Sequence, residues 1–188
     1  EDICFFHEGD SFTPYGIPSS AIYEGYMDVE MYSGIVVENI VYTDNGIEFD
    51  AGAEIFGQYS KTEDKKGVRL TFREKYGMSE VVYPFFPDSV GGNNSFKSLL
   101  LRPSGQDQTK GMLRDEIVPV IIRGRVEVDY QEFLPCALYV NGEYWGLYYI
   151  RERLDEDYLV SKYGFEKGKT DLIKSQMFVQ AGSDNDYV

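Results

Sequence analysis

The densest group of basic side chains in this chain lies in one short loop between two predicted strands. The loop spans residues 57–67, begins at Gly57, and carries the Ser60 hydroxyl together with three ammonium groups, on Lys61, Lys65 and Lys66. Backbone amides at a glycine turn, together with lysine side chains, suit the anionic oxygens of a phosphate group. The spacing matches neither GxGxxG nor GxxxxGK[ST], so a phosphate site and a solvated hairpin tip both remain open.

A second group of chemical interest follows an apolar predicted strand. Glu152 comes directly after residues 145–150 and lies between Arg151 and Arg153. If that strand is central in a sheet, the Glu152 carboxylate is buried and can pair with a lysine. The alternative is a charged strand exit in which the adjacent arginines neutralise Glu152.

A third charged group, formed by residues 102–107 with Arg114 and Asp115, is expected to have structural roles. Asp107 can cap the helix predicted after Thr109. Arg114 can pair with Asp115 or with a more distant carboxylate.

A sheet must position these groups, because short strand-like segments dominate the chain. Alternating or apolar segments predict strands at 26–32, 39–42, 46–49, 53–57, 68–73, 96–102, 137–140, 145–150 and 171–174. Asn-Gly dipeptides at 45–46 and 141–142 predict hairpins. Helices are predicted after Thr109, with a kink or break at Pro119, and over 155–163. The expected fold class is α+β: mainly antiparallel β-sheet with two or three packed helices.

The composition excludes several classes of protein. The 188 residues contain 18 Lys+Arg and 32 Asp+Glu, a net charge of −14, which argues against a basic nucleic-acid groove. A hydrophobic content of 43% argues against disorder. No apolar run reaches the roughly 18–20 residues that a membrane span requires.

The cysteines do not predict a metal site. Cys4 and Cys136 are the only two, and His7 is the only histidine, so the four ligands of a zinc site are lacking. Cys136 is expected to be a buried thiol, and a disulfide between Cys4 and Cys136 is the alternative.

Four segments of the chain resemble the CotH family, kinases named for spore coat protein H. Residues 57–61 and 65–70 are similar to its G-x-S-S-R…K-K-S-x-R-L stretch, and residues 75–77 and 83–86 to KYG…YPLF. Residues 100–107 and 113–115 are similar to LLRNxGxD…LRD, and residues 139–152 resemble VNGEYxGLYxLxE. The last motif is the most specific, and the resemblance runs from about Ala51 to Lys174.

The resemblance implies the nucleotide-side lobe of an atypical kinase fold, which binds ATP with Mg²⁺ and phosphorylates protein. Gly57, Ser60 and Lys61 would belong to the phosphate-facing loop. Lys66 would contact the nucleotide, and Glu152 would lie near the adenine or the lysine. The chain departs from the family pattern at Lys61, where Arg is usual, and at Gly67, where a small hydroxyl residue is usual.

The resemblance also implies a division of the chain. Residues 1–50 would form an acidic, β-rich lead-in, and residues 51–188 the kinase N-terminal lobe, truncated before the catalytic lobe. The metal-holding and catalytic aspartates are expected beyond Val188, so we assign no catalytic or metal-binding residue and expect the fragment alone to be inactive. A secreted or bacterial-surface location is also implied.

Two other functions remain open at the level of sequence. The 16 Tyr and 12 Phe residues are compatible with a bacterial-surface module that binds carbohydrate or protein, because aromatic faces stack on sugars and anchor interfaces. A pseudokinase-like scaffold, in which the basic loop is only structural, is the other alternative.

Overall fold

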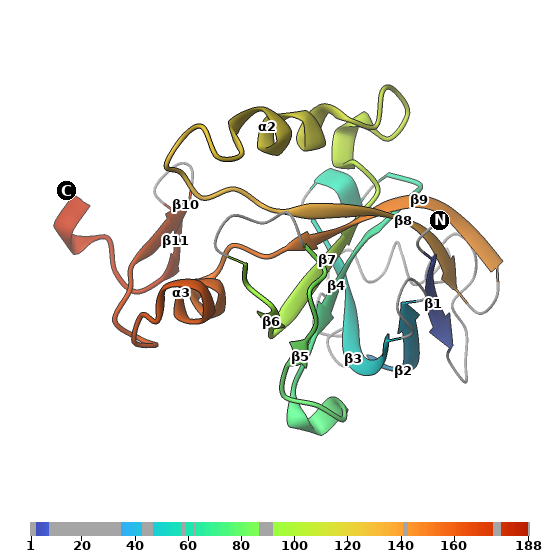
Figure 1. Ribbon diagram of the computed structural model, residues 1–188, viewed down its shortest axis with the longest axis horizontal. Helices are drawn as coiled ribbons and strands as arrows, with labels where there is room; N and C mark the ends of the chain where they lie inside the picture. The colour runs from blue at the N-terminus through green and yellow to red at the C-terminus, as the bar shows by residue number, and fades with distance from the viewer. Residues whose placement is uncertain are drawn as a thin grey trace.

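Seven strands form a closed barrel that organises most of the chain (Figure 1). The computed structural model describes residues 3–7, 35–42, 47–57, 59–61, 63–86, 92–140, 143–174 and 178–187. Around the barrel the order is β1-β2-β3-β4-β7-β9-β8. The strands are β1 (Ile3–His7), β2 (Ile35–Tyr42), β3 (Ile47–Phe56), β4 (Gly67–Thr71), β7 (Ser98–Arg102), β8 (Phe133–Val140) and β9 (Glu143–Glu152).

Neighbouring strands of the barrel are antiparallel, except that β1 and β8 pair in parallel. The hairpin predicted at 141–142 is confirmed, because Val140 pairs with Glu143 across β8 and β9. The strand predicted at 26–32 lies outside the described residues. The domain boundary predicted between residues 50 and 51 falls inside β3, and the division into two domains stays a prediction.

One difference from the expected elements concerns β3. The sequence predicts separate strands at 46–49 and 53–57, whereas the structure has one strand that continues through Gly52. A side chain at Gly52 would overlap the ring of Tyr76, which packs against the strand at this point. The glycine therefore serves close packing within a continuous strand and does not mark a turn.

The core fills the interior of the barrel with residues that alternate along each strand. One interior row contains Val68, Leu101 and Ile150, which are all buried. At one end the core becomes aromatic, with Phe49 against Phe72 at 5.4 Å and Phe85 against Phe96 at 5.8 Å between ring centroids, both edge-on. These interior rows confirm the period-two pattern of the sequence.

In the described part of the chain two α-helices accompany the sheet, and the α+β class is confirmed. Helix α2 (Arg114–Ile122) lies along the outer side of β8 and β9, and α3 (Glu156–Tyr163) follows β9 (Figure 1). Short strands form two small sheets, β5 (Val81–Val82) with β6 (Ser95–Phe96) and β10 (Leu172–Lys174) with β11 (Phe178–Ala181). Among the described residues, no helix is long and apolar enough to cross a membrane.

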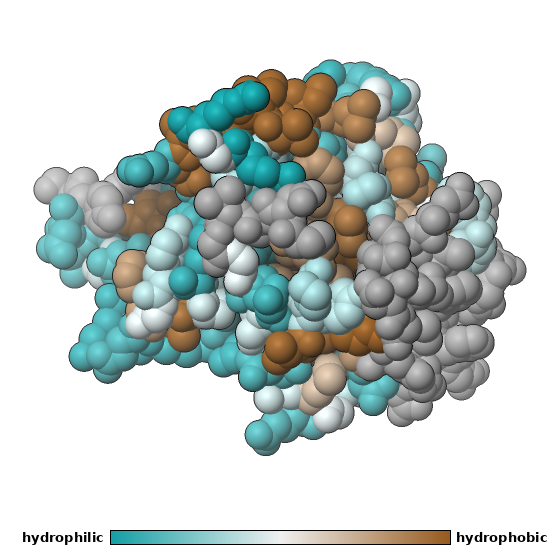
Figure 2. All heavy atoms as spheres, viewed as in Figure 1, coloured by the Kyte–Doolittle hydropathy of each residue, from teal (hydrophilic) through white to brown (hydrophobic). Residues whose placement is uncertain are grey.

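Helix α2 differs from its expected packing. It continues through Pro119 to Ile122, so the predicted break is wrong. Proline has no backbone N–H, so Pro119 cannot donate a hydrogen bond within the helix. Its buried residues are Glu116 and Pro119, whereas large aliphatic side chains are 50–56% exposed, at Leu113, Ile117, Val118, Val120 and Ile121. Figure 2 shows these side chains as a hydrophobic patch over α2.

Candidate functional site

The loop of residues 57–67 joins β3 to β4 and includes a single 3₁₀ turn at Tyr59–Lys61. Gly57 has a φ of 133°, a region that residues with a side chain avoid. A Cβ at this position would also overlap the hydroxyl oxygen of Ser60. The glycine therefore allows the chain to turn tightly against Ser60 as it leaves the sheet.

Lys66 points into the protein and lies inside its own loop. The side chain is only 6% exposed, and its Nζ donates hydrogen bonds to the carbonyl oxygens of Lys61 (2.9 Å) and Glu63. Burial lowers the pKa of Lys66, while the nearby charges of Asp64 and Glu63 act to raise it. An ammonium group has three donors, so one remains after these two bonds.

Residues outside the loop hold it in place by hydrogen bonds and close packing. The Tyr148 hydroxyl on β9 donates to the carbonyl oxygen of Lys66 at 3.1 Å. The backbone N–H of Lys65 donates to Oε1 of Gln108 at 3.2 Å. A Cβ at Gly146 would lie 2.5 Å from Nζ of Lys65, so this ammonium group rests directly on β9. A fully solvated hairpin tip does not describe this loop.

Glu152 is the last residue of β9 and is 2% exposed, so the structure shows the buried carboxylate, one of the two interpretations that the sequence left open. Burial raises the pKa of Glu152 to about 7. The hydrogen bond from the backbone N–H of Glu132 and the charge of Lys162 act in the opposite direction and lower it. The Glu132 N–H donates to Oε2 of Glu152 at 3.3 Å. Neither adjacent arginine neutralises Glu152, because Arg151 pairs with Glu116 and Arg153 with Asp155.

The strand register places Lys66 and Glu152 far apart. Glu152 on β9 pairs with Leu99 on β7, and Leu99 in turn pairs with Leu70 on β4. Lys66 precedes Leu70 by four residues, which corresponds to about 13 Å along the strand. The buried row that contains Val68 lies between them. The structure thus does not bring together the two charged groups that the sequence places in one site.

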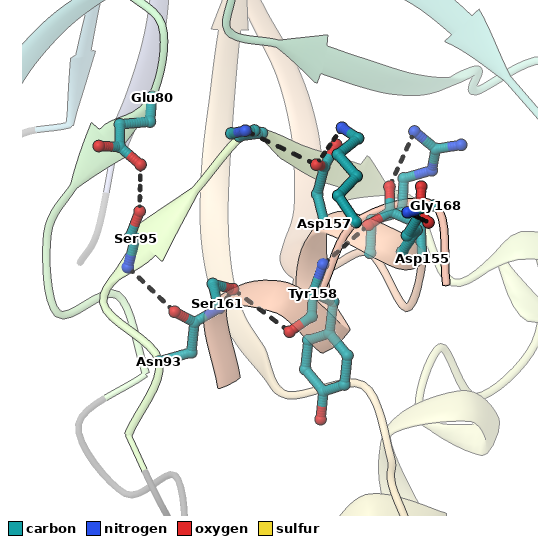
Figure 3. Close-up of polar contacts among 12 residues, drawn as sticks. Glu80, Asn93, Ser95, Asp155, Asp157, Tyr158, Ser161 and Gly168 are labelled. Carbon is teal, nitrogen blue, oxygen red and sulfur yellow. Dashed lines mark hydrogen bonds and ion pairs between the residues drawn. The ribbon is translucent and has the colours of Figure 1, made fainter. Parts of the chain in front are cut away.

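Glu152 instead lines a cavity of about 320 Å³ at the end of the barrel, which we call the barrel-end pocket. Its walls come from the segment before β7, the exit of β9 and the start of α3, and include Asn93, Ser95, Glu152, Asp155, Asp157 and Tyr158. Figure 3 shows one wall, in which hydrogen bonds connect the labelled polar side chains. Asn93 Nδ2 donates to the Ser161 hydroxyl (3.0 Å), and the Ser95 hydroxyl donates to Glu80 (2.6 Å).

The start of α3 supplies the carboxylates of the opposite wall (Figure 3). Asp155 caps the helix by accepting the backbone N–H of Tyr158 at 3.1 Å, and it pairs with Arg153 at 3.1 Å. Asp157 pairs with Lys167 at 2.6 Å and lies 3.7 Å from Lys97. The wall is therefore polar, with its charges largely paired.

Sequence reasoning did not identify the barrel-end pocket as a site. The acidic residues at 155–157 are recognisable as a helix start, and residues 91–94 as a loop. No spacing in the sequence indicates that these two segments meet. The two segments meet because β7 and β9 are neighbours in the sheet, and this pairing is visible only in the folded structure.

The third charged group has the structural role expected of it. Asp107 Oδ2 accepts the backbone N–H groups of Leu113 (3.2 Å) and Arg114 (3.3 Å) at the start of α2. Arg114 pairs with Asp107 at 3.4 Å, and Asp115 pairs with Arg102 at 3.1 Å. These contacts fix the helix start and the segment that leads to it.

Two further observations concern cysteine and metal chemistry. Cys136 is buried, as expected of a structural thiol. The side chain of Cys4, the partner in the alternative disulfide, is outside the described part of the chain. Within the described residues, no three His, Cys, Asp or Glu side chains are grouped so that they could hold a metal ion.

Comparison with known proteins identifies the family. Residues 53–187, which include the basic loop and the barrel-end pocket, match the family described as CotH kinase protein. A search of curated proteins found no match. The family match covers well over half of the chain and the segments that carry the sequence resemblance. This chain is a member of the CotH kinase family.

Proposed function

We propose that this chain is the nucleotide-binding part of a protein kinase that transfers a phosphoryl group from ATP to protein in the full-length molecule. The observation that carries the proposal is the position of Lys66, an ammonium group buried inside a glycine-initiated loop of a CotH-family domain. Phosphoryl transfer depends mainly on positioning and charge neutralisation, and a fixed ammonium group contributes to both.

The loop has the donors that phosphate oxygens require. The third N–H of Lys66 is directed at neither carbonyl, and Lys61 is half-buried at the same turn. In this proposal Gly57 and Ser60 shape the turn so that backbone N–H groups approach the phosphates. Both bonds from Lys66 to carbonyl oxygens keep the ammonium group in place before the nucleotide arrives.

Mg²⁺ bound to ATP would neutralise charge on the transferring phosphate. The described residues offer no grouped set of ligands for it. We therefore assign the metal to the nucleotide phosphates and to carboxylates of the catalytic lobe, outside the residues described. On this assignment the present residues bind and orient the nucleotide but do not transfer the phosphoryl group alone. Export to the bacterial surface belongs to the same proposal and is tested by cell fractionation.

The test is ATP·Mg²⁺ binding by the full-length protein, measured by isothermal titration calorimetry. Lys66→Ala is expected to weaken binding by more than about tenfold, because a charge-assisted hydrogen bond is lost. Lys110→Ala removes the same charge from an exposed position and is expected to leave affinity unchanged. Circular dichroism of each variant checks the fold. Equal affinity of a folded Lys66→Ala protein would contradict the assignment.

A second candidate is a non-catalytic module that binds a sugar in the barrel-end pocket. The observation that favours it is the lining, in which carboxylate, amide and hydroxyl groups surround Phe96 and Tyr158. Such groups bond to sugar hydroxyls, and aromatic faces pack on sugar rings. This candidate predicts a thermal shift with an oligosaccharide panel and none with ATP·Mg²⁺, which is the opposite of the kinase proposal.

A further inference from the structure

A small basic cleft lies on the outer face of the barrel, on β3 and β4. It has a volume of about 70 Å³, and its walls include Gly52, Glu54, Arg69, Thr71, Arg73 and Tyr76. The backbone is still extended at Arg73, where β4 has ended, so Arg69, Thr71 and Arg73 alternate on one face. Two guanidinium groups therefore flank one hydroxyl group over a single cleft.

The floor of the cleft is built by close packing. Gly52 has no side chain, and the ring of Tyr76 occupies the space that a Cβ would need. The backbone N–H of Tyr76 donates to the carbonyl oxygen of Arg73 at 2.7 Å, which fixes the turn after the strand. Nζ of Lys75 lies 4.5 Å from the centre of the Tyr76 ring and adds a further cation near the cleft.

The cations of the cleft exceed its anions. Arg69 pairs with Glu54, but its buried Nε has no hydrogen-bond partner in the structure. Arg73 is exposed and forms no ion pair with any residue that the structure describes. Arg153, on the neighbouring row, is already paired with Asp155. Burial lowers the pKa of Arg69, and the charges of Arg153 and Arg73 lower it further, while the charge of Asp155 acts to raise it.

We infer that this cleft binds a phosphate group, held by the guanidinium groups of Arg69 and Arg73 and by the hydroxyl of Thr71. Two guanidinium forks and a hydroxyl group on one face of a strand offer donors to the oxygens of a phosphate group. On the same measure one water molecule needs about 10–15 Å³, so a cleft of about 70 Å³ has room for a group of the size of a phosphate. The phosphate is either a free ion or the exposed end of a nucleotide.

This site is separate from the basic loop. Arg69 lies on β4, whereas Lys66 precedes that strand and its Nζ bonds to carbonyl oxygens of its own loop. Lys66 points inward, whereas the cleft opens on the outside of the barrel. The inference therefore goes beyond the proposed nucleotide contact at Lys66, and either can fail without the other.

Binding of inorganic phosphate to the purified protein is measured by calorimetry, with sodium chloride at matched ionic strength as the reference. Arg73→Ala is expected to weaken phosphate binding by about tenfold, and Arg73→Lys by less, because Lys keeps the charge without the fork. Lys110→Ala, with the same change in net charge, is expected to bind phosphate as the wild type does. Because Arg73 is exposed and forms no ion pair within the described part of the chain, its replacement should leave the fold intact.

A competition arm identifies the source of the phosphate. If ATP displaces inorganic phosphate from the wild type and Arg73→Ala reduces the affinity for both, the group belongs to a nucleotide. If ATP does not displace it, the site takes the free ion. The inference is overturned if phosphate has no effect beyond that of chloride, or if Arg73→Ala binds phosphate as tightly as Lys110→Ala does.

Discussion

The hydroxyl group of Tyr148 donates a hydrogen bond to the carbonyl oxygen of Lys66 at 3.1 Å, in the buried interior of the barrel. The bond joins residues 82 positions apart in the sequence. It connects β9, which carries the most specific family motif, to the base of the basic loop. Two segments that resemble the family separately are therefore one structural unit.

Removal of this hydroxyl group is expected to weaken the loop. Tyr148→Phe should lower the free energy of unfolding by about 1 kcal/mol, because the Lys66 carbonyl loses a buried partner. Tyr144→Phe is the control, since Tyr144 is exposed on the same strand. Urea unfolding followed by circular dichroism measures both. A Tyr148→Phe protein as stable as Tyr144→Phe would show that the bond does not fix the loop.

Helix α2 is expected to depend on one buried ion pair. Arg151 Nη2 lies 2.6 Å from Oε1 of Glu116, and their side chains are 4% and 2% exposed. Glu116→Ala should cost about 3–5 kcal/mol, because it leaves a buried guanidinium group without its partner. Urea unfolding measures the loss.

The double variant Glu116→Ala with Arg151→Met distinguishes a charge effect from a packing effect. Removal of both charges should recover much of the stability, because neither partner is then left buried alone. If the double variant is no more stable than Glu116→Ala, the cost comes from lost packing at the helix and not from the unpaired charge.

Glu152 is expected to make stability depend on pH. Its pKa is about 7 in the folded protein against 4.5 as the ordinary value, so the folded state holds the proton over this interval while the unfolded state releases it. Stability should therefore fall as pH rises from 4.5 to 7, by up to about 3 kcal/mol. Glu152→Gln cannot titrate and should lose this part of the pH dependence.

The measurement is urea unfolding of both proteins between pH 4.5 and 8. Glu166→Gln, which removes an exposed carboxylate, serves as the control and should keep the slope of the wild type. The difference between wild type and Glu152→Gln isolates one group from all other titrations. If the two profiles are parallel across this range, the pKa of Glu152 is not raised.

The local elements of this fold are readable from the sequence, whereas the burial of Glu152 was one of two interpretations that the sequence left open. Alternation along a strand shows which residues share a face, and Asn-Gly at 141–142 joins β8 to β9. Neither signal says which non-consecutive strands are neighbours. The parallel pair β1–β8 that closes the barrel therefore had no counterpart in the sequence analysis.

The same limit explains what sequence reasoning missed around the candidate site. Lys66 precedes one strand signal and Glu152 follows another, but the distance between them depends on the registers of β4, β7 and β9. In α2, the large aliphatic side chains are exposed, whereas Glu116 is buried and pairs with Arg151 on β9. A buried ion pair leaves no periodic pattern, so hydrophobic spacing alone gives the wrong face.

The turn at Gly57 is expected to tolerate no side chain. Gly57→Ala combines a φ of 133° with an overlap against the Ser60 hydroxyl, whereas Gly168→Ala meets a positive φ of 82° in open space. Gly57→Ala should therefore cost more than the roughly 1–3 kcal/mol of backbone strain expected for either site. The double variant Gly57→Ala with Ser60→Gly removes the overlap and should recover the excess in urea unfolding. Equal losses for Gly57→Ala and Gly168→Ala would mean that the loop relaxes around the new side chain, so the turn would not be tightly constrained.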